Sequence, residues 1–172
     1  PDATVSTVAD GAKGNGNWAT KTPDEILMDI NTAITETWAQ GEYDLGAMPN
    51  HILLPYEEYT DILTRKVSEL ATETIFDYVM RNNVAVKNGG KLFIGATRWC
   101  KGAGSSNTDR MVVYAHNDRF IKMDELVPMS RIMSAPNVAN VCYDTAYMAN
   151  LSEPQILYPQ TITYWDNIGG DT

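Results

Sequence analysis

Apolar residues recur at every fourth position over one long stretch near the start of the chain, the spacing of one face of an α-helix. The stripe consists of Ile26, Ile30, Ile34 and Trp38. Just before it, TPDE at residues 22–25 supplies a capping threonine, a proline for the first turn and a glutamate in capping-box order. Gly41 stands where a helix would end. The pattern predicts a helix over 22–40, about 18 residues and roughly 27 Å long.

The run HILLPYEEY, residues 51–59, predicts a strand that leads directly into a helix. HILL has the length and apolar character of a buried strand. Pro55 lacks an N–H and suits the first turn of a helix, predicted here over 55–64. Glu57 and Glu58 follow where the positive end of the helix dipole favours carboxylates. Both glutamates are therefore expected to stabilise the start of this helix.

Beyond residue 64 the pattern changes from helices to strands. Helical spacing predicts a helix over 68–82, and KLFIGA and RMVVYAH predict two strands joined by the loop TRWCKGAGSSNTD. Residues 119–136 are mixed, whereas 139–147 alternate and predict one long strand. QILYP and TITYWDN predict two more. Helices, then a mixed middle, then strands indicate an α+β fold.

The first 21 residues are small and polar, and their glycines predict a flexible linker over 1–21. The chain begins with Pro1 and shows neither the basic start nor the apolar segment of a signal peptide. We expect that an upstream segment was removed.

Composition and charge narrow the function classes. The 172 residues are 44% hydrophobic and 20% charged, which suits one domain or two small subdomains. No apolar stretch approaches the roughly 18 residues of a membrane span, so no membrane partner is expected. A net charge of −9 disfavours nucleic-acid binding driven by phosphate contacts. Cys100 and Cys142 form no disulfide framework and are interpreted as reduced cytosolic thiols.

No motif for metal, phosphate or nucleophilic chemistry is complete. His51 and His116 lack HExxH or HxH spacing and are interpreted as residues at strand borders that form local hydrogen bonds. KGAGSSNT lacks the order of a phosphate loop, and Ser105 and Ser106 lack the GxSxG elbow of a hydrolase. The sequence therefore predicts no catalytic, cofactor-binding or metal-binding residue.

Two alternatives to a purely structural protein stay open. A small cytosolic enzyme would use Glu57 or Asp144 as a general base, although paired carboxylates at helix starts are expected to act as caps first. A protein-binding module would present aromatic strand residues to a partner. These aromatics, for which packing on strand faces is favoured, are Trp99, Tyr143, Tyr147, Tyr158, Tyr164 and Trp165.

The order of several motifs resembles a known family. NHILLPYEEYTDIL is followed by RMVVYAHNDRFIKMDEL, then by the long alternating strand and by PQTITYWDNI, across about residues 22–168. This order is similar to the tailed-phage major capsid protein of the Hong Kong 97 type, whose fold is shared with encapsulin shells. The resemblance implies a structural protein that assembles from copies of itself into the icosahedral head of a phage or prophage.

The resemblance also implies a domain layout. The helix 22–40 would be the spine helix of a peripheral P domain formed by 22–50 and 138–172. Residues 51–137 would form an axial A domain of mixed sheet and helices, at the centre of each pentamer or hexamer, with KGAGSSNT near that axis or near a neighbouring subunit.

One departure from the family concerns the start of the chain. The 21 residues before the spine helix are too few for the N-terminal arm and the E-loop hairpin that the family carries there. The chain is therefore expected to be the C-terminal part of a longer subunit. Alone, it is expected to stay a monomer or a small oligomer, whereas the full-length form would assemble in the bacterial cytoplasm into a virion capsid.

Overall fold

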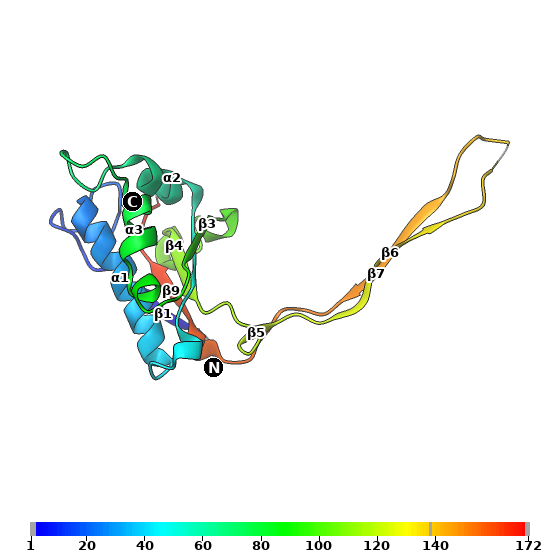
Figure 1. The fold of residues 1–172 in the computed structure, drawn as a ribbon. Coiled ribbons are helices and arrows are strands. Elements are labelled where there is room, and N and C mark those ends of the chain that lie inside the picture. The colour runs from blue at the N-terminus through cyan, green and yellow to red at the C-terminus, as the bar shows by residue number, and fades with distance from the viewer. Residues whose placement is uncertain (1–2, 138, 171–172) are drawn as a thin grey trace.

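A five-stranded sheet forms the centre of the body of the molecule (Figure 1). The computed structural model describes residues 3–137 and 139–170. The strands of this sheet are β1 (Thr4–Thr7), β2 (His51–Leu54), β3 (Phe93–Ala96), β4 (Arg110–Tyr114) and β9 (Ile162–Asp166). They lie in the order β1-β9-β4-β2-β3, with β1–β9 and β2–β3 parallel and the other two pairs antiparallel. The first and last strands of the chain are therefore neighbours.

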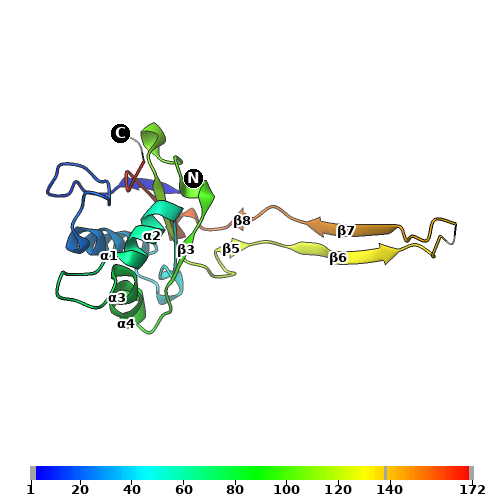
Figure 2. The same ribbon diagram turned by 90° about the horizontal axis from the view of Figure 1, so that it is seen from above.

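One face of the sheet is packed and the other is more open. Ile52 and Leu54 of β2 and Met111 and Val113 of β4 are 0% exposed, whereas the residues between them are half-buried. This alternation is typical of strands with one face in a core. Figure 2 shows the helices gathered on one side of the sheet. Helix α1 (Pro23–Gln40) lies against β4 and β9 on the packed face.

Helix α1 confirms the predicted capped helix. The Thr22 side chain accepts a hydrogen bond from the Glu25 N–H at 3.4 Å, and the Glu25 carboxylate accepts one from the Thr22 N–H at 2.7 Å. Ile26, Ile30 and Ile34 are 0% exposed, so the predicted stripe is the buried face. The helix thus starts and packs as its local sequence dictates.

Replacing Thr22 with alanine is expected to lower the free energy of unfolding by about 1 kcal/mol, because the first turn loses the side-chain acceptor for an N–H. Urea denaturation of the 172-residue chain measures this loss. Thr35→Ala, an exposed position within the same helix, is the matched control and is expected to change stability by less than about 0.5 kcal/mol. Equal losses in the two variants would contradict the role of the cap.

The remaining helices are α2 (Tyr56–Thr64), α3 (Ile75–Asn82) and α4 (Val84–Lys87). The predicted strand-to-helix junction is confirmed, with Pro55 at the N-cap of α2. The predicted helix over 68–82 was too long. Leu70 is 99% exposed, and α3 begins only after Thr74, whose side chain accepts from the Asp77 N–H at 3.2 Å. The N-cap at Thr74 therefore fixes where α3 begins, although apolar residues at helical spacing continue upstream of it.

The prediction of a flexible linker over 1–21 was wrong for the residues that the structure describes. Strand β1 pairs with β9, and Trp18 is 0% exposed. The Trp18 indole N–H donates to the Asp29 carboxylate at 2.9 Å, and the Lys21 ammonium approaches the same carboxylate to 2.5 Å. Gly16 allows close packing, because a Cβ there would lie 2.5 Å from the Asn167 carbonyl oxygen. The glycines of this segment permit close backbone approach.

A long antiparallel hairpin leaves the body between β4 and β9, as Figures 1 and 2 both show. Its strands are β5 (Ile121–Lys122), β6 (Glu125–Met133), β7 (Thr145–Leu151) and β8 (Gln155–Ile156), with β5 paired to β8 and β6 to β7. We call residues 121–156 the hairpin arm. At 3.3 Å per residue its outgoing strand could reach about 50 Å.

The arm corrects the prediction of a long packed strand over 139–147. Strand β7 begins at Thr145, is exposed along its length and pairs with β6, so it does not lie beside α1. Val141 has a positive φ of 51° and breaks the extended backbone before β7. Alternation of apolar and polar residues predicted a strand correctly but could not show that the strand is left uncovered by the other described residues.

The division into a P domain (22–50 and 138–172) and an A domain (51–137) stays a prediction. Strands β2, β3 and β4 of the middle range share one sheet with β9. Residues 138 and 171–172 of the predicted P domain lie outside the described residues. Short 3-10 helices cover Leu45–Ala47, Arg98–Cys100, Ser105–Asn107 and Pro159–Thr161. No helix in the described ranges has the length and apolar character to cross a membrane.

Candidate assembly site

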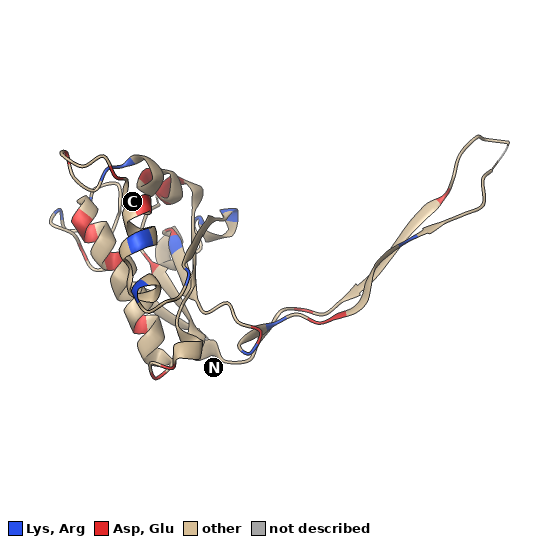
Figure 3. Cartoon of the chain, viewed as in Figure 1, with Lys and Arg blue, Asp and Glu red and all other residues tan. Residues whose placement is uncertain are grey.

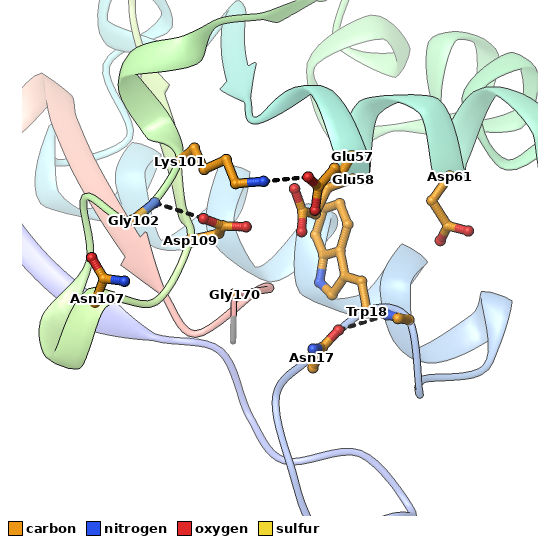
Figure 4. A pocket seen from close by; sticks show the side chains of 11 residues that line it. Asn17, Trp18, Glu57, Glu58, Asp61, Lys101, Gly102, Asn107, Asp109 and Gly170 are labelled. Atoms are coloured by element: carbon orange, nitrogen blue, oxygen red, sulfur yellow. Dashed lines mark hydrogen bonds and ion pairs between the residues drawn. The ribbon is translucent and has the colours of Figure 1, made fainter. Parts of the chain in front are cut away.

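An acidic pocket opens on the body at the first turn of α2 (Figure 4). Its walls come from residues 17–19, the start of α2, the loop around 101–109 and Gly170, and its volume is about 450 Å³. The charged side chains that line it are Glu57, Glu58, Asp61, Lys101 and Asp109. Four carboxyl groups therefore share the pocket with one lysine.

The backbone around Asp109 brings two carboxyl groups together. The Asp109 N–H donates to the Gly169 carbonyl at 2.9 Å, and the Ile168 N–H donates to the Asp109 carbonyl at 3.3 Å. This pairing holds the C-terminal segment against the start of β4. Gly169 is required, because a Cβ there would lie 1.8 Å from Oε1 of Glu58. The Glu58 carboxyl consequently fits beside Asp109.

The carboxyl groups of Asp109 and Glu58 have different hydrogen-bond partners. Oδ1 of Asp109 accepts from the Gly102 N–H at 2.6 Å. The pKa of Glu58 is raised to about 7, mainly by burial and in addition by the charge and the hydrogen bond of Asp109. Glu57, in contrast, is exposed and forms an ion pair with Lys101. Both glutamates were predicted to stabilise the start of the helix through its dipole. That role alone describes the exposed Glu57 but not the buried Glu58.

Several carboxylate oxygens in the pocket wall have no hydrogen-bond partner among the residues that the structure describes. They are Oε2 of Glu58, Oδ2 of Asp61 and Oδ2 of Asp109. Buried polar atoms are normally paired, and Glu58 and Asp109 meet this requirement in part by hydrogen-bonding each other.

The hairpin arm is the second unusual surface, because its large apolar side chains are exposed. Leu126 is 77% exposed and Tyr147 is 67% exposed. Ile132 and Met133 are consecutive, as are Tyr147 and Met148, so apolar side chains point to both faces of the ribbon. The other large apolar residues exposed on the arm are Met123, Met129, Val141, Tyr143, Leu151 and Ile156. Both faces of the arm therefore carry exposed apolar side chains.

The half-open face of the sheet carries the two histidines. His51 forms a 2.8 Å hydrogen bond between Nδ1 and Oδ1 of Asn50, as expected for a local partner. Its ring centroid also lies 4.6 Å from that of His116, a proximity that the sequence did not indicate. Burial lowers the pKa of His51, and His116 lowers it further. Within the described residues, no group of three or more His, Cys, Asp or Glu side chains is placed to hold a metal ion.

The other candidate residues of the sequence do not converge. Ser105 donates from its N–H and hydroxyl to Asp166, at 2.8 and 2.9 Å, so the loop around it is anchored. Burial raises the pKa of the Cys100 thiol to about 11, and Cys142 is exposed on the arm. Asp144 is also on the arm, whereas Glu57 is on the body.

The aromatic residues divide between core and surface. Trp165 is buried, as packing on a strand face predicts, whereas Trp99 is 74% exposed and Tyr143 and Tyr158 are also exposed. Tyr164 lies on the half-open face, where the Arg110 guanidinium is 4.9 Å from its ring centroid. Strand packing therefore accounts for Trp165, and contact with another subunit is the alternative that fits the exposed rings.

Comparison with known proteins decides which family carries this fold. A family model described as "Major capsid protein" matches residues 1–168. The chain belongs to the major capsid protein family. A search of curated proteins found no match.

Two solved structures share the fold of this capsid protein. The capsid of Myoviridae phage XM1 matches with a TM-score of 0.69 at 16% identity, covering 96% of this chain and 51% of that one. A virus-like particle from Pyrococcus furiosus matches with a TM-score of 0.58 at 15% identity, covering 95% of this chain and 56% of that one. The chain thus spans about half the length of the structures that it matches.

These findings confirm the predicted family and the α+β capsid fold. They support a structural protein and give no support to an enzyme that uses Glu57 or Asp144. Two features escaped the sequence analysis, namely the apolar arm and the pairing of Glu58 with Asp109. The alternating residues of β7 pointed to a strand, but nothing local to Asp109 indicated its distant partner.

Proposed function

We propose that this capsid protein acts as a shell subunit by associating with copies of itself through the hairpin arm. The observation that carries the proposal is the exposure of apolar side chains on both faces of the arm. In the full-length form, the associated copies would be the pentamers and hexamers of an icosahedral phage head, formed in the bacterial cytoplasm and retained in the virion.

Physical chemistry favours an arm that is covered in the assembled state. An isolated two-stranded ribbon is at best marginally stable in water. Monomeric soluble proteins rarely expose contiguous apolar patches above a few hundred Å². A second copy that packs along the arm would remove both problems and would supply the area of a stable interface, on the order of 800 Å² per partner.

The charge of the chain is compatible with this role. A net charge of −9 gives little attraction to phosphate backbones, so we expect copies to associate without bound nucleic acid. Family membership and the two fold matches also support self-assembly.

Removing the arm is expected to abolish association beyond dimers while leaving the sheet folded. In this armless variant, residues 123–154 are replaced by Asn-Gly, which suits a tight turn between antiparallel strands. Sedimentation velocity at roughly 100 µM chain, a concentration that detects even weak contacts, compares its oligomers with those of the unmodified chain. Larger species that persist without the arm would overturn the proposal.

A point variant distinguishes association through the arm from non-specific association of exposed apolar side chains. Tyr147→Ser on β7 is expected to reduce the larger species, because its ring is 67% exposed on the arm. Leu70→Ser is the matched control, since Leu70 is 99% exposed on the body. The control is expected to leave the distribution of oligomers unchanged. Equal effects at both positions would show that the arm has no special role.

A further inference from the structure

The two histidines of the half-open face lie where the hairpin arm leaves the body. His51 opens β2, whereas His116 follows the end of β4 and precedes the first arm strand at Ile121. Their ring centroids are 4.6 Å apart, and the ring planes are inclined by 54°. Within the described residues neither ring takes part in an ion pair, and the hydrogen bonds of His116 are made by its backbone. The fold therefore brings together two imidazoles that are far apart in the sequence.

The side chain of Asn50 determines which nitrogen of His51 carries a proton. Its Nδ2 donates to the His116 carbonyl at 3.2 Å, and its Oδ1 accepts from the His116 N–H at 2.7 Å. These two bonds fix which atom of the amide is the oxygen. Because Oδ1 also lies 2.8 Å from Nδ1 of His51, Nδ1 is the donor and carries the proton of the neutral ring. Nε2 of His51 is then unprotonated and has a free lone pair.

A histidine that donates one ring N–H to an oxygen and leaves its other nitrogen free has the arrangement of a metal-binding histidine. The rings of Phe93 and Tyr114 pack beside His51, with centroid distances of 5.1 and 5.3 Å, and help to hold it in place. His116, in contrast, is exposed, so its ring can rotate and present either nitrogen to an ion. The pair thus combines one oriented imidazole with one adjustable imidazole.

The separation of the two rings suits a single shared ion. Metal–nitrogen bonds of about 2.0–2.1 Å place two imidazoles with their centroids about 4.5 Å apart at a bond angle of about 90°, and about 5.2 Å apart at the tetrahedral angle. The observed 4.6 Å lies in this range, near the value for a square-planar ion. The backbone therefore already holds both rings at the separation that a shared metal ion requires.

We propose that His51 and His116 together bind one divalent transition-metal ion of the kind that imidazole prefers, such as Cu²⁺, Ni²⁺ or Zn²⁺. No third side-chain ligand is grouped with them in the described part of the chain, so water completes the coordination. Near the root of the arm, where Figure 3 shows residues of both charges, Asp124 is already paired with Lys122 at 2.8 Å. The bound ion links β2 to the segment that leads into the arm. This binding does not require copies of the chain to associate, so it stands or falls separately from the proposed function.

The protonated nitrogen of His51 is the first test. Nitrogen-15 NMR of the histidine rings in the metal-free 172-residue chain, at about pH 7.5 where neutral rings predominate, distinguishes protonated from unprotonated nitrogens. The His116→Gln variant assigns the signals, because it leaves His51 as the remaining histidine of the chain. A proton on Nδ1 of His51 is expected. A proton on Nε2 instead would overturn the proposal, because the nitrogen left free would be the one that faces Asn50.

Titration with ZnCl₂, followed by the same ring signals, tests binding itself. The chain carries Cys142→Ser for this purpose, because the exposed thiol of Cys142 could bind zinc on its own. The signals of His51 and His116 are expected to shift together along one binding curve. Ions held by carboxylates elsewhere do not enter this measurement, since it reports on the imidazoles alone. Shifts of one ring only, or of neither, would contradict a shared ion.

Removing one imidazole is expected to weaken zinc binding at least about tenfold. His116→Gln is read from the His51 signals, and Asp118→Asn is the matched control because Asp118 is an exposed carboxylate of the same segment. The control is expected to change the affinity by less than about twofold. Circular dichroism establishes that each variant is folded. His51→Gln, read from the His116 signals, is the second variant and is expected to show the same loss. Affinities equal to that of the control in both histidine variants would overturn the proposal.

Discussion

Replacing Lys21 with methionine is expected to lower the free energy of unfolding by about 3–5 kcal/mol near neutral pH. The Lys21 ammonium lies 2.5 Å from the Asp29 carboxylate and 2.6 Å from the Ala9 carbonyl oxygen, and both charged side chains are buried. Burial raises the pKa of Asp29, while the hydrogen bond and the charge of Lys21 lower it. Methionine fills a similar volume but leaves Asp29 buried beside the Trp18 indole without its counter-charge.

A second substitution tests this explanation. Lys21→Met combined with Asp29→Asn removes the uncompensated charge and keeps an oxygen for the Trp18 N–H. The double variant is expected to be more stable than Lys21→Met alone by about 1–3 kcal/mol. Urea denaturation gives both values. A loss below about 1 kcal/mol for Lys21→Met would show that the pair is not energetically important.

Replacing Glu58 with glutamine is expected to change how stability depends on pH. The folded state holds the Glu58 proton up to a pKa of about 7, whereas an unfolded glutamate releases it near the ordinary glutamate pKa of 4.5. The folded state therefore binds more protons between these two values, and the stability of the unmodified chain falls as pH rises through this window. The total fall is about 3 kcal/mol, from 1.36 kcal/mol per unit.

Glutamine does not titrate and can donate its amide N–H to Asp109, so the variant lacks this fall. The difference in unfolding free energy is expected to shift in favour of Glu58→Gln between about pH 5 and about pH 8. Urea denaturation at several pH values measures it. Glu57→Gln serves as the control, because Glu57 is exposed on the same helical turn, and its difference is expected to change little with pH. A constant difference for Glu58→Gln would exclude a raised pKa.

Features specified by neighbouring residues were predicted well. Helix α1 was located by the capping box at Thr22 and Glu25 and by the isoleucine stripe. Capping and amphipathic spacing both act within a few residues. The same holds for β2 and α2 around Pro55. Family membership followed from the order of such local motifs.

Features that depend on distant partners were missed. Strand β1 forms by pairing with β9, which is far from it in the sequence. Asp109 meets Glu58 because the backbone of the C-terminal segment closes over the end of β4. Neither pairing leaves a local signal.

The arm shows a different limit of the sequence. An alternating strand such as 145–151 looks the same whether its cover is in the same chain or in another molecule. Hydrophobic patterning reports that a surface needs burial, but it does not report which molecule provides it.

The position of β9 has a consequence for synthesis. This strand lies inside the sheet between β1 and β4, yet it is made after all the other strands of that sheet. A nascent chain still attached to the ribosome would hold β1 without its partner and β4 with one open edge. The slow, long-range pairing that completes the sheet can begin only after β9 has been made, so premature stop codons shortly before residue 162 are expected to yield insoluble protein.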